Sequence, residues 1–125
     1  MHAARYSSAP DPGQVLSTAV LRAATNLDIS QAMLARILGI SPATASRLVH
    51  GSYLLSEARE KEWELAVMFV RIFRAIDAIV GHGEVAKQWL HSNNTALHGR
   101  PIDLIIKAEG MVRVLNYLDA YRGRI

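Results

Sequence analysis

Apolar residues recur at helical spacing along almost the whole chain, and no segment alternates apolar and polar residues for long enough to suggest a strand. Residues that favour helix ends divide this pattern into separate helices. Ser, Asp and Pro stand where helices begin, and Gly stands where two of them end. The first three predicted helices run from Asp11-Pro12 to about Asn26, from Ser30 to Gly39, and from Ser41-Pro42 to Gly51.

A long fourth helix with a strongly apolar middle follows. It is predicted from Ser56 to about Val80, and its segment from Trp63 to Phe73 is apolar on nearly every side. We therefore expect this helix to be a buried spine on which both halves of the chain pack. After a break at residues 81–83, shorter helices are predicted over about 84–91, 102–106 and 110–121.

The connections in the second half carry turn-forming residues. Asn93 and Asn94 can tie a turn through hydrogen bonds from side chain to backbone. Gly99 allows a positive φ, and Pro101 begins the short helix that follows. Gly110 permits either close helix packing or a turn before the last helix. These residues predict a compact helical subdomain.

The composition narrows the class of protein. Half of the 125 residues are apolar and a fifth are charged, which suits one ordinary domain or two very small ones that share a core. The chain has no cysteine, so thiolate chemistry, disulfides and Cys-based zinc sites are excluded. The longest apolar run, residues 65–70, is too short to span a membrane, and the N-terminus lacks the apolar run of a signal peptide. We expect a cytoplasmic protein without a membrane partner.

The net charge of +3 is modest. Residues 1–55 contain four Arg and two acidic residues, so this half is poor in acid rather than rich in base. Such a balance is compatible with a surface that faces phosphate, but many proteins share it.

No arrangement of residues typical of catalysis is present. None of the five histidines forms the His-Glu-x-x-His pattern of a zinc protease helix. The chain also lacks a glycine-rich phosphate loop and a Gly-x-Ser-x-Gly turn. We therefore expect neither an enzyme nor a metal site nor a cofactor.

The stretch from Ser30 to Val49 predicts a helix-turn-helix. Two short helices that cross steeply around a tight turn need a small residue where the second presses on the first, and Ala35 supplies it. The motif also needs a turn glycine, an apolar plug, an N-cap and two apolar anchors. These are Gly39, Ile40, Ser41, Ala45 and Leu48, all at the required offsets.

With this motif, residues 13–55 resemble the Xre/Cro-like repressors, whose second helix lies in the major groove and whose dimers read two half-sites. The resemblance implies a phosphate contact at Gln31 and a guanine or phosphate contact at Arg47. Thr44, Ser46 and Arg47 are expected on the outward face of the recognition helix. The full set of candidate DNA-binding residues is Gln31, Ser41, Thr44, Ser46, Arg47 and His50.

Three residues depart from the family's pattern. Pro42 and Ala43 stand where long polar base readers are common, and Ala45 replaces a larger β-branched anchor. We therefore do not expect one copy to recognise a DNA sequence strongly by itself. We expect a homodimer that binds two half-sites. A helix-turn-helix kept as scaffold or dimer surface remains an open alternative.

A second pattern covers about residues 57–125. Trp89-Leu90, the Asn pair, Leu97, a Gly-x-Pro-x-Asp-Leu-Ile segment over residues 99–105 and a Gly-x-x-x-Val-x-x-x-Leu segment over residues 110–118 follow one another. This order resembles the toxin-binding domain of antitoxins of the Xre/MbcA/ParS type. Together the two resemblances span nearly the whole chain.

The second resemblance implies an antitoxin of a type II toxin–antitoxin system. Its partners would be a cognate RES-domain toxin, which degrades NAD⁺, and operator DNA, and the antitoxin would obstruct the active site of the toxin. The natural obstructing element is the end of the chain, where arginines, tyrosines and a terminal carboxylate lie close together. The candidate toxin-binding residues are Arg100, Asn116, Tyr117, Tyr121, Arg122, Arg124 and Ile125.

The predicted fold is therefore all-α. A helix-turn-helix bundle over residues 13–55, after a flexible lead-in at 1–12, packs through the long central helix onto a small toxin-binding domain, and residues 56–125 comprise that helix and domain. Two other functions remain open. One is a free-standing Xre-like transcriptional repressor whose C-terminal domain only dimerises, and the other is an interaction module whose helix-turn-helix no longer touches DNA.

Overall fold

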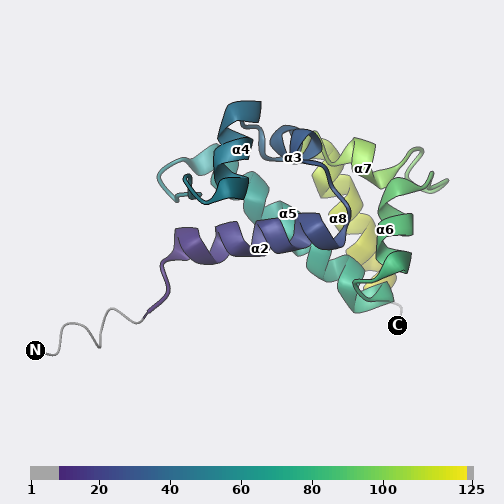
Figure 1. Cartoon of the computed structure of the whole chain (residues 1–125). Coiled ribbons are helices and arrows are strands. Elements are labelled where there is room, and N and C mark those ends of the chain that lie inside the picture. Colours follow the sequence, from purple (N-terminus) through teal and green to yellow (C-terminus); the bar gives the residue numbers. More distant parts are fainter. Residues whose placement is uncertain (1–8, 124–125) are drawn as a thin grey trace, which may run out of the picture.

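The computed structural model describes residues 9–123, which form seven helices and no strand (Figure 1). This confirms the all-α prediction. The helices are α2 (Pro12–Asn26), α3 (Gln31–Leu38), α4 (Pro42–His50), α5 (Glu60–Val80), α6 (Glu84–His91), α7 (Pro101–Leu104) and α8 (Ala108–Arg122). Most of the predicted lead-in lies outside the described residues, and its last two residues cap and begin α2.

Side-chain caps set the starts of the first three helices, as predicted. Asp11, Ser30 and Ser41 each accept the backbone N–H three residues further on, at 2.9 to 3.1 Å. Gly39 and Gly51 end α3 and α4 with φ values of 69° and 87°, in the left-handed region that glycine adopts without strain.

The start of α5 differs from the prediction by four residues. Ser56 does not cap the helix, because its hydroxyl accepts the N–H of Ala58 at 3.2 Å and so forms a local turn. Arg59 takes the N-cap position, where its guanidinium donates to the carbonyl of Leu54 and to the carboxylate of Glu62. The polar residue before the apolar run therefore makes a turn, and the helix begins at Glu60.

Helix α5 is the spine of the fold, as predicted. Figure 1 shows it running behind α2 toward α8, with α3 and α4 near its first half and α6 near its second. Phe69, Ile72 and Ala75 are fully buried, and one continuous hydrophobic core joins both halves of the chain. The apolar middle is not buried on every side, however, because Val67 is 37% exposed.

The connections around α7 correct two further expectations. The helix covers Pro101–Leu104 rather than 102–106. The positive φ of the preceding loop, 59°, belongs to His98 and not to Gly99. Gly99 instead exchanges two backbone hydrogen bonds with Asn94, at 2.9 and 3.2 Å. Because Gly99 is held in this pairing, His98 adopts the left-handed conformation of the turn.

Gly110 lies inside α8, at a close contact between two backbones. A Cβ atom added there would stand 1.8 Å from the carbonyl oxygen of Leu104 at the end of α7. The sequence allowed either close helix packing or a turn at Gly110, and the structure shows close helix packing.

Candidate functional site

Helices α3 and α4 cross around the turn at Gly39 and form the predicted helix-turn-helix. Ala35 on α3 is 3% exposed, and Ala45 and Leu48 on α4 are buried against it and the core. The N–H of Ile40 donates to the carbonyl of Ala35 at 3.0 Å and so closes the turn. The small and apolar residues of the motif are used for packing, which leaves the opposite side of α4 at the surface.

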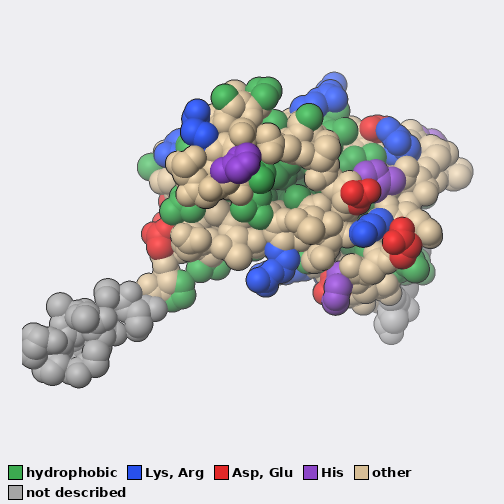
Figure 2. Space-filling model, viewed as in Figure 1, with side chains coloured by type: hydrophobic (Ala, Val, Ile, Leu, Met, Phe, Trp, Pro, Cys, Tyr) green, Lys and Arg blue, Asp and Glu red, His purple; other side chains and the backbone are tan. Residues whose placement is uncertain are grey.

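That outer side of α4 carries part of the predicted DNA-binding set. Arg47 and His50 are exposed, whereas Thr44 and Ser46 are half-buried at the flanks of the helix. Figure 2 shows basic and histidine side chains over the region of α3 and α4. The centre of the outer face is therefore Ala43, Arg47 and His50, with only two long polar side chains.

Local hydrogen bonds hold these side chains in place. The guanidinium of Arg47 donates to the hydroxyl of Thr44 at 3.2 Å and keeps further N–H groups for a ligand. His50 donates from Nδ1 to the carbonyl of Ser46 at 2.7 Å and so satisfies an end carbonyl of the helix. The hydroxyl of Ser41 caps α4 and donates to Thr44 at 2.9 Å.

Helix α3 adds one cation that sequence reasoning missed. Gln31 is exposed at the first position of α3, where the family resemblance implies a phosphate contact. Arg36 is exposed in the last turn of the same helix and forms no ion pair within residues 9–123. The sequence signal that could have identified Arg36 was its position as a basic residue inside the predicted helix-turn-helix.

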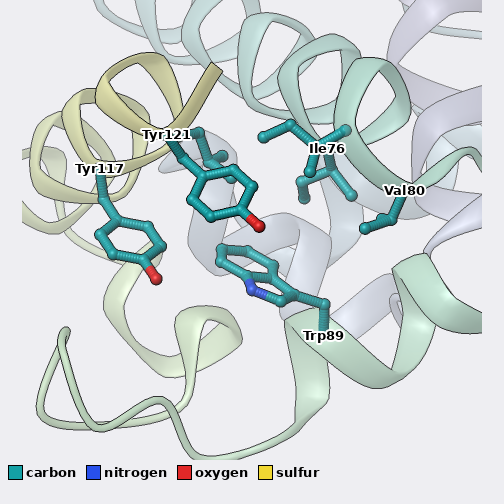
Figure 3. A pocket seen from close by; sticks show the side chains of 7 residues that line it. Ile76, Val80, Trp89, Tyr117 and Tyr121 are labelled. Atoms are coloured by element: carbon teal, nitrogen blue, oxygen red, sulfur yellow. The ribbon is translucent and has the colours of Figure 1, made fainter. Parts of the chain in front are cut away.

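A second candidate site lies where α5, α6 and α8 meet. Trp89 and Tyr117 stack with ring centroids 6.3 Å apart and planes inclined by 17°. Figure 3 shows them beside Tyr121, next to a cavity of about 170 Å³. The cavity is lined by Ile76, Ile79, Val80, Trp89, Tyr117, Leu118 and Tyr121.

This cavity opens to the surface at its aromatic rim. Tyr121 is 45% exposed, whereas Ile76 is 1% exposed and forms part of the core. An apolar floor with aromatic walls and a phenol at the mouth is suited to an apolar side chain from a partner. The sequence grouped Tyr117 and Tyr121 at the end of the chain, but it did not place Trp89 against them.

Two family models match the chain and together cover most of it. Residues 8–71 match the antitoxin Xre-like helix-turn-helix domain, and residues 75–124 match the antitoxin Xre/MbcA/ParS C-terminal toxin-binding domain. The chain belongs to the Xre-like antitoxins. The two matches meet within α5, so the first turns of the spine go with the helix-turn-helix and its end goes with the toxin-binding domain. Comparison with individually curated proteins gave no match.

The family matches divide the two candidate sites between two kinds of partner. The surface of α3 and α4 lies within the helix-turn-helix match, and the aromatic cavity lies wholly within the toxin-binding match. The antitoxin therefore carries both surfaces on one core, with α5 common to them.

Part of the predicted toxin-binding set gathers at the end of α8. Asn116 and Tyr121 are exposed, and Tyr117 is half-buried in the stack with Trp89. Arg122 is exposed and pairs with Asp119 at 3.8 Å. Arg124 and Ile125 lie outside the described residues.

Arg100 lies apart from that group. It stands at the N-cap of α7, and Figure 1 shows α7 at the opposite end of α8 from the C-terminus. Its guanidinium makes two hydrogen bonds to Asp103, at 2.8 and 3.0 Å, and the first cause of its raised pKa is this hydrogen bonding. Both side chains are half exposed, so a partner can still reach the pair.

One hydrogen bond joins the two halves of the antitoxin directly. Nε2 of His91, at the end of α6, donates to the carbonyl of Leu27 at 2.9 Å, just after α2. The acceptor is a backbone carbonyl, so Nε2 carries the proton. The helix-turn-helix and the toxin-binding domain are thus tied through polar as well as apolar contacts.

A second polar cluster fastens the segment between α4 and α5. The hydroxyl of Tyr53 donates to Glu62, and the guanidinium of Arg59 stacks 4.7 Å from the centroid of the Tyr53 ring. Burial, and after it the hydrogen bond to Glu62, raises the pKa of Tyr53. The hydrogen bond to Glu62 is the first cause of the raised pKa of Arg59. This cluster holds α5 in place and is not part of either surface.

Residues 9–123 show neither a metal-binding cluster nor a membrane span. Three or more His, Asp or Glu side chains do not converge there as they would around a metal ion. Within the same range, no helix is both long enough and apolar enough to cross a membrane.

Proposed function

We propose that this antitoxin neutralises a RES-domain toxin that degrades NAD⁺ and represses its own operon through the helix-turn-helix. The observation that carries the proposal is the pair of adjacent family matches on one continuous core. In the proposal, the antitoxin acts as a homodimer within a larger toxin–antitoxin complex, because one recognition helix supplies too little affinity alone.

The DNA half of the proposal is supported by the surface of α3 and α4. Gln31 and Arg36 lie exposed on α3, and Arg47 and His50 lie on the outer side of α4. The first turn of α3 also presents the backbone N–H groups of Gln31 and Ala32, and that of α4 presents the N–H of Ala43, because Pro42 has none; such groups favour phosphate. With only two long side chains on α4, most of the affinity comes from phosphate contacts and little from base readout.

The toxin half is supported by the aromatic cavity and the end of α8. We propose that an apolar side chain of the toxin enters the cavity between Trp89 and Tyr121, as the anchor of the complex. Residues 116–125 then extend toward the active site of the toxin, where the arginines engage carboxylates or nucleotide-binding polar groups. Arg100 and Asp103 make a separate, peripheral contact.

Co-expression with the neighbouring reading frame tests the antitoxin function. We expect that frame alone to stop growth and deplete cellular NAD⁺, and we expect this chain to abolish both effects and to co-purify with its product. A neighbour that is harmless and forms no complex would refute the proposal and leave a free-standing regulator.

Variants at the end of α8 test the toxin surface. Tyr121→Ala removes the exposed rim of the cavity, and deletion of residues 121–125 removes the tail with it. Val112→Ala is the matched control, because Val112 is equally exposed, at 44% against 45%, on the opposite side of α8. We expect neutralisation to weaken with the first two variants and not with the control. Full neutralisation by the truncated chain would overturn the role of the tail.

Binding to the promoter of its own operon tests the regulatory function. The affinity should fall steeply as salt rises, because phosphate contacts release counterions. Binding that is absent at low salt would favour an interaction module whose helix-turn-helix does not touch DNA.

A further inference from the structure

One exposed stripe of α5 carries charges in a symmetric order. Glu60 and Glu64 precede Val67 by seven and three residues, and Arg71 and Arg74 follow it by four and seven. All five residues are exposed, and they fall within about 60° of Val67 around the helix. None of the four charges forms an ion pair in the part of the chain that the structure describes. The stripe therefore shows acids at one end, an apolar centre and arginines at the other end.

This order is unfavourable in a single copy. Two acids four residues apart, and two arginines three residues apart, repel each other on the surface of a helix. Lys61 and Asp77 stand three residues from Glu64 and Arg74, but neither forms an ion pair with them within residues 9–123, so both repulsions remain. A partner that brings arginines to the acids and acids to the arginines would remove both repulsions at once.

A second copy of the same helix, turned by 180°, is such a partner. If two α5 helices pack antiparallel about an axis through Val67, Glu64 of each copy faces Arg71 of the other, and Glu60 faces Arg74. The stripe from Glu60 to Arg74 is about 21 Å long, which is long enough to form a helix pair. A twofold axis requires this kind of self-complementarity.

Apolar groups surround the centre of the stripe. Trp63 and Val67 line a shallow groove between α2 and α5, together with Val15, which is 51% exposed. They also line a second hollow along α5, with Met68. An aromatic residue in an exposed apolar groove, ringed by charges, is the composition of an interface centre. In the antiparallel pair, Arg71 of the second copy also lies over Trp63.

We propose that the antitoxin forms a homodimer through antiparallel packing of α5, with Val67 on the twofold axis. None of the residues that line the two hollows belongs to α3, α4, α6 or α8. The dimer therefore leaves the recognition helix and the aromatic cavity open. This inference deepens the homodimer of the proposed function by naming its face and its register.

A charge-swap cycle on the full chain, without toxin or DNA, tests the register. Glu64→Arg and Arg71→Glu each place like charges opposite each other twice, and we expect each to raise the dissociation constant of the dimer by about tenfold or more. The double variant restores opposite charges at the same pairs and should bring the constant back close to that of the wild type. Sedimentation equilibrium measures the constant, and thermal unfolding checks that these exposed substitutions keep the fold.

Lys61→Glu is the matched control. It makes the same change in net charge as Arg71→Glu, but it lies about 120° around α5 from Val67. We expect it to leave the dissociation constant unchanged. Since the chain has no cysteine, Val67→Cys provides an independent check. It should give a disulfide-linked dimer under mild oxidation, and Lys61→Cys should not.

A wild-type chain that stays monomeric at high micromolar concentration would overturn the inference. So would single reversals without effect, or a double variant as weak as the single ones. Failure of the proposed function would look different, because loss of toxin or promoter binding leaves the self-association of the isolated chain unchanged.

Discussion

Gly110→Ala should force apart the two backbones that meet between α7 and α8. The added Cβ would lie 1.8 Å from the carbonyl oxygen of Leu104 and 2.7 Å from its carbonyl carbon. Carbon and carbonyl oxygen stay about 3.3 Å apart even in close backbone contacts, so α7 and α8 must separate by about 1.5 Å. The obstacle is backbone, so no rotation of a side chain can relieve the clash.

The magnitude follows from two opposing effects. Overpacking a well-packed interior costs about 1–3 kcal/mol, and a backbone obstacle places the cost at the upper end. Alanine returns about 1 kcal/mol through its higher helix propensity, so the net loss is about 2 kcal/mol. Unfolding entropy for a domain of this size is about 0.25 kcal/mol per degree, and Tm should fall by about 8 °C.

Thermal unfolding followed by circular dichroism at 222 nm measures the change. Gly123→Ala is the control, because Gly123 has an ordinary φ of −64° and its added Cβ would be 3.5 Å from the nearest atoms. We expect Tm to stay the same or rise slightly in the control. A Gly110→Ala protein that melts at or above the wild-type temperature would show that the contact with Leu104 is not tight and would refute the reasoning.

Three further predictions rest on single contacts. Ser17→Ala should lower the free energy of unfolding in urea by about 1–3 kcal/mol, because the buried hydroxyl of Ser17 accepts the N–H of Leu55 at 3.0 Å and no other partner would replace it. Arg47→Ala should weaken promoter binding, and the slope of the logarithm of the binding constant against the logarithm of salt concentration should become shallower by about 1. An unchanged affinity would exclude Arg47 from the interface. The pKa of Tyr53 is raised on folding, so its contribution to stability is present below the unfolded value and is lost as pH rises through the folded one. Above about pH 10, the wild type should therefore lose stability faster than Tyr53→Phe in denaturant titrations, and parallel losses would contradict this.

Local signals in the sequence were enough to place most helix ends. A cap needs only its own side chain and the N–H three residues on, and Asp11, Ser30 and Ser41 make that contact in the structure. Ser56 has the same chemistry, but its hydroxyl turns to a nearer N–H while Arg59 is held by Glu62. The choice between cap and turn depends on those partners, and a residue-by-residue pattern does not contain them.

The candidate sites were predictable only where they lie on one helix. The outer side of α4 follows from helical spacing, so Arg47 and His50 were found at the surface where expected. The aromatic cavity needs Trp89 and Tyr117, which are far apart in the chain and meet only because α6 and α8 pack on α5. Tyr117 and Tyr121 were predicted as part of a tail, whereas in the structure they line a cavity together with residues of the core.

The central helix shows why an apolar run can mislead. Its middle suggests burial on every side, but α2 and α3 on one flank and α6 and α8 on the other leave one stripe uncovered. That stripe is the part of the helix that holds Val67 between charges that form no ion pair within residues 9–123. Apolar residues on a helix that is already packed on its other sides point to a further partner, because a monomer gains nothing by exposing them.

The shared core also decides how the two functions of the antitoxin influence each other. Phe69, Ile72 and Ile76 of α5 belong to one cluster with residues from both halves, and His91 bonds to Leu27 across them. A chain held together in this way unfolds as a unit, so a partner that binds only the folded state stabilises both halves. In the proposed function, toxin bound at α8 would therefore protect the helix-turn-helix, and DNA bound at α4 would protect the toxin surface, without any change of shape.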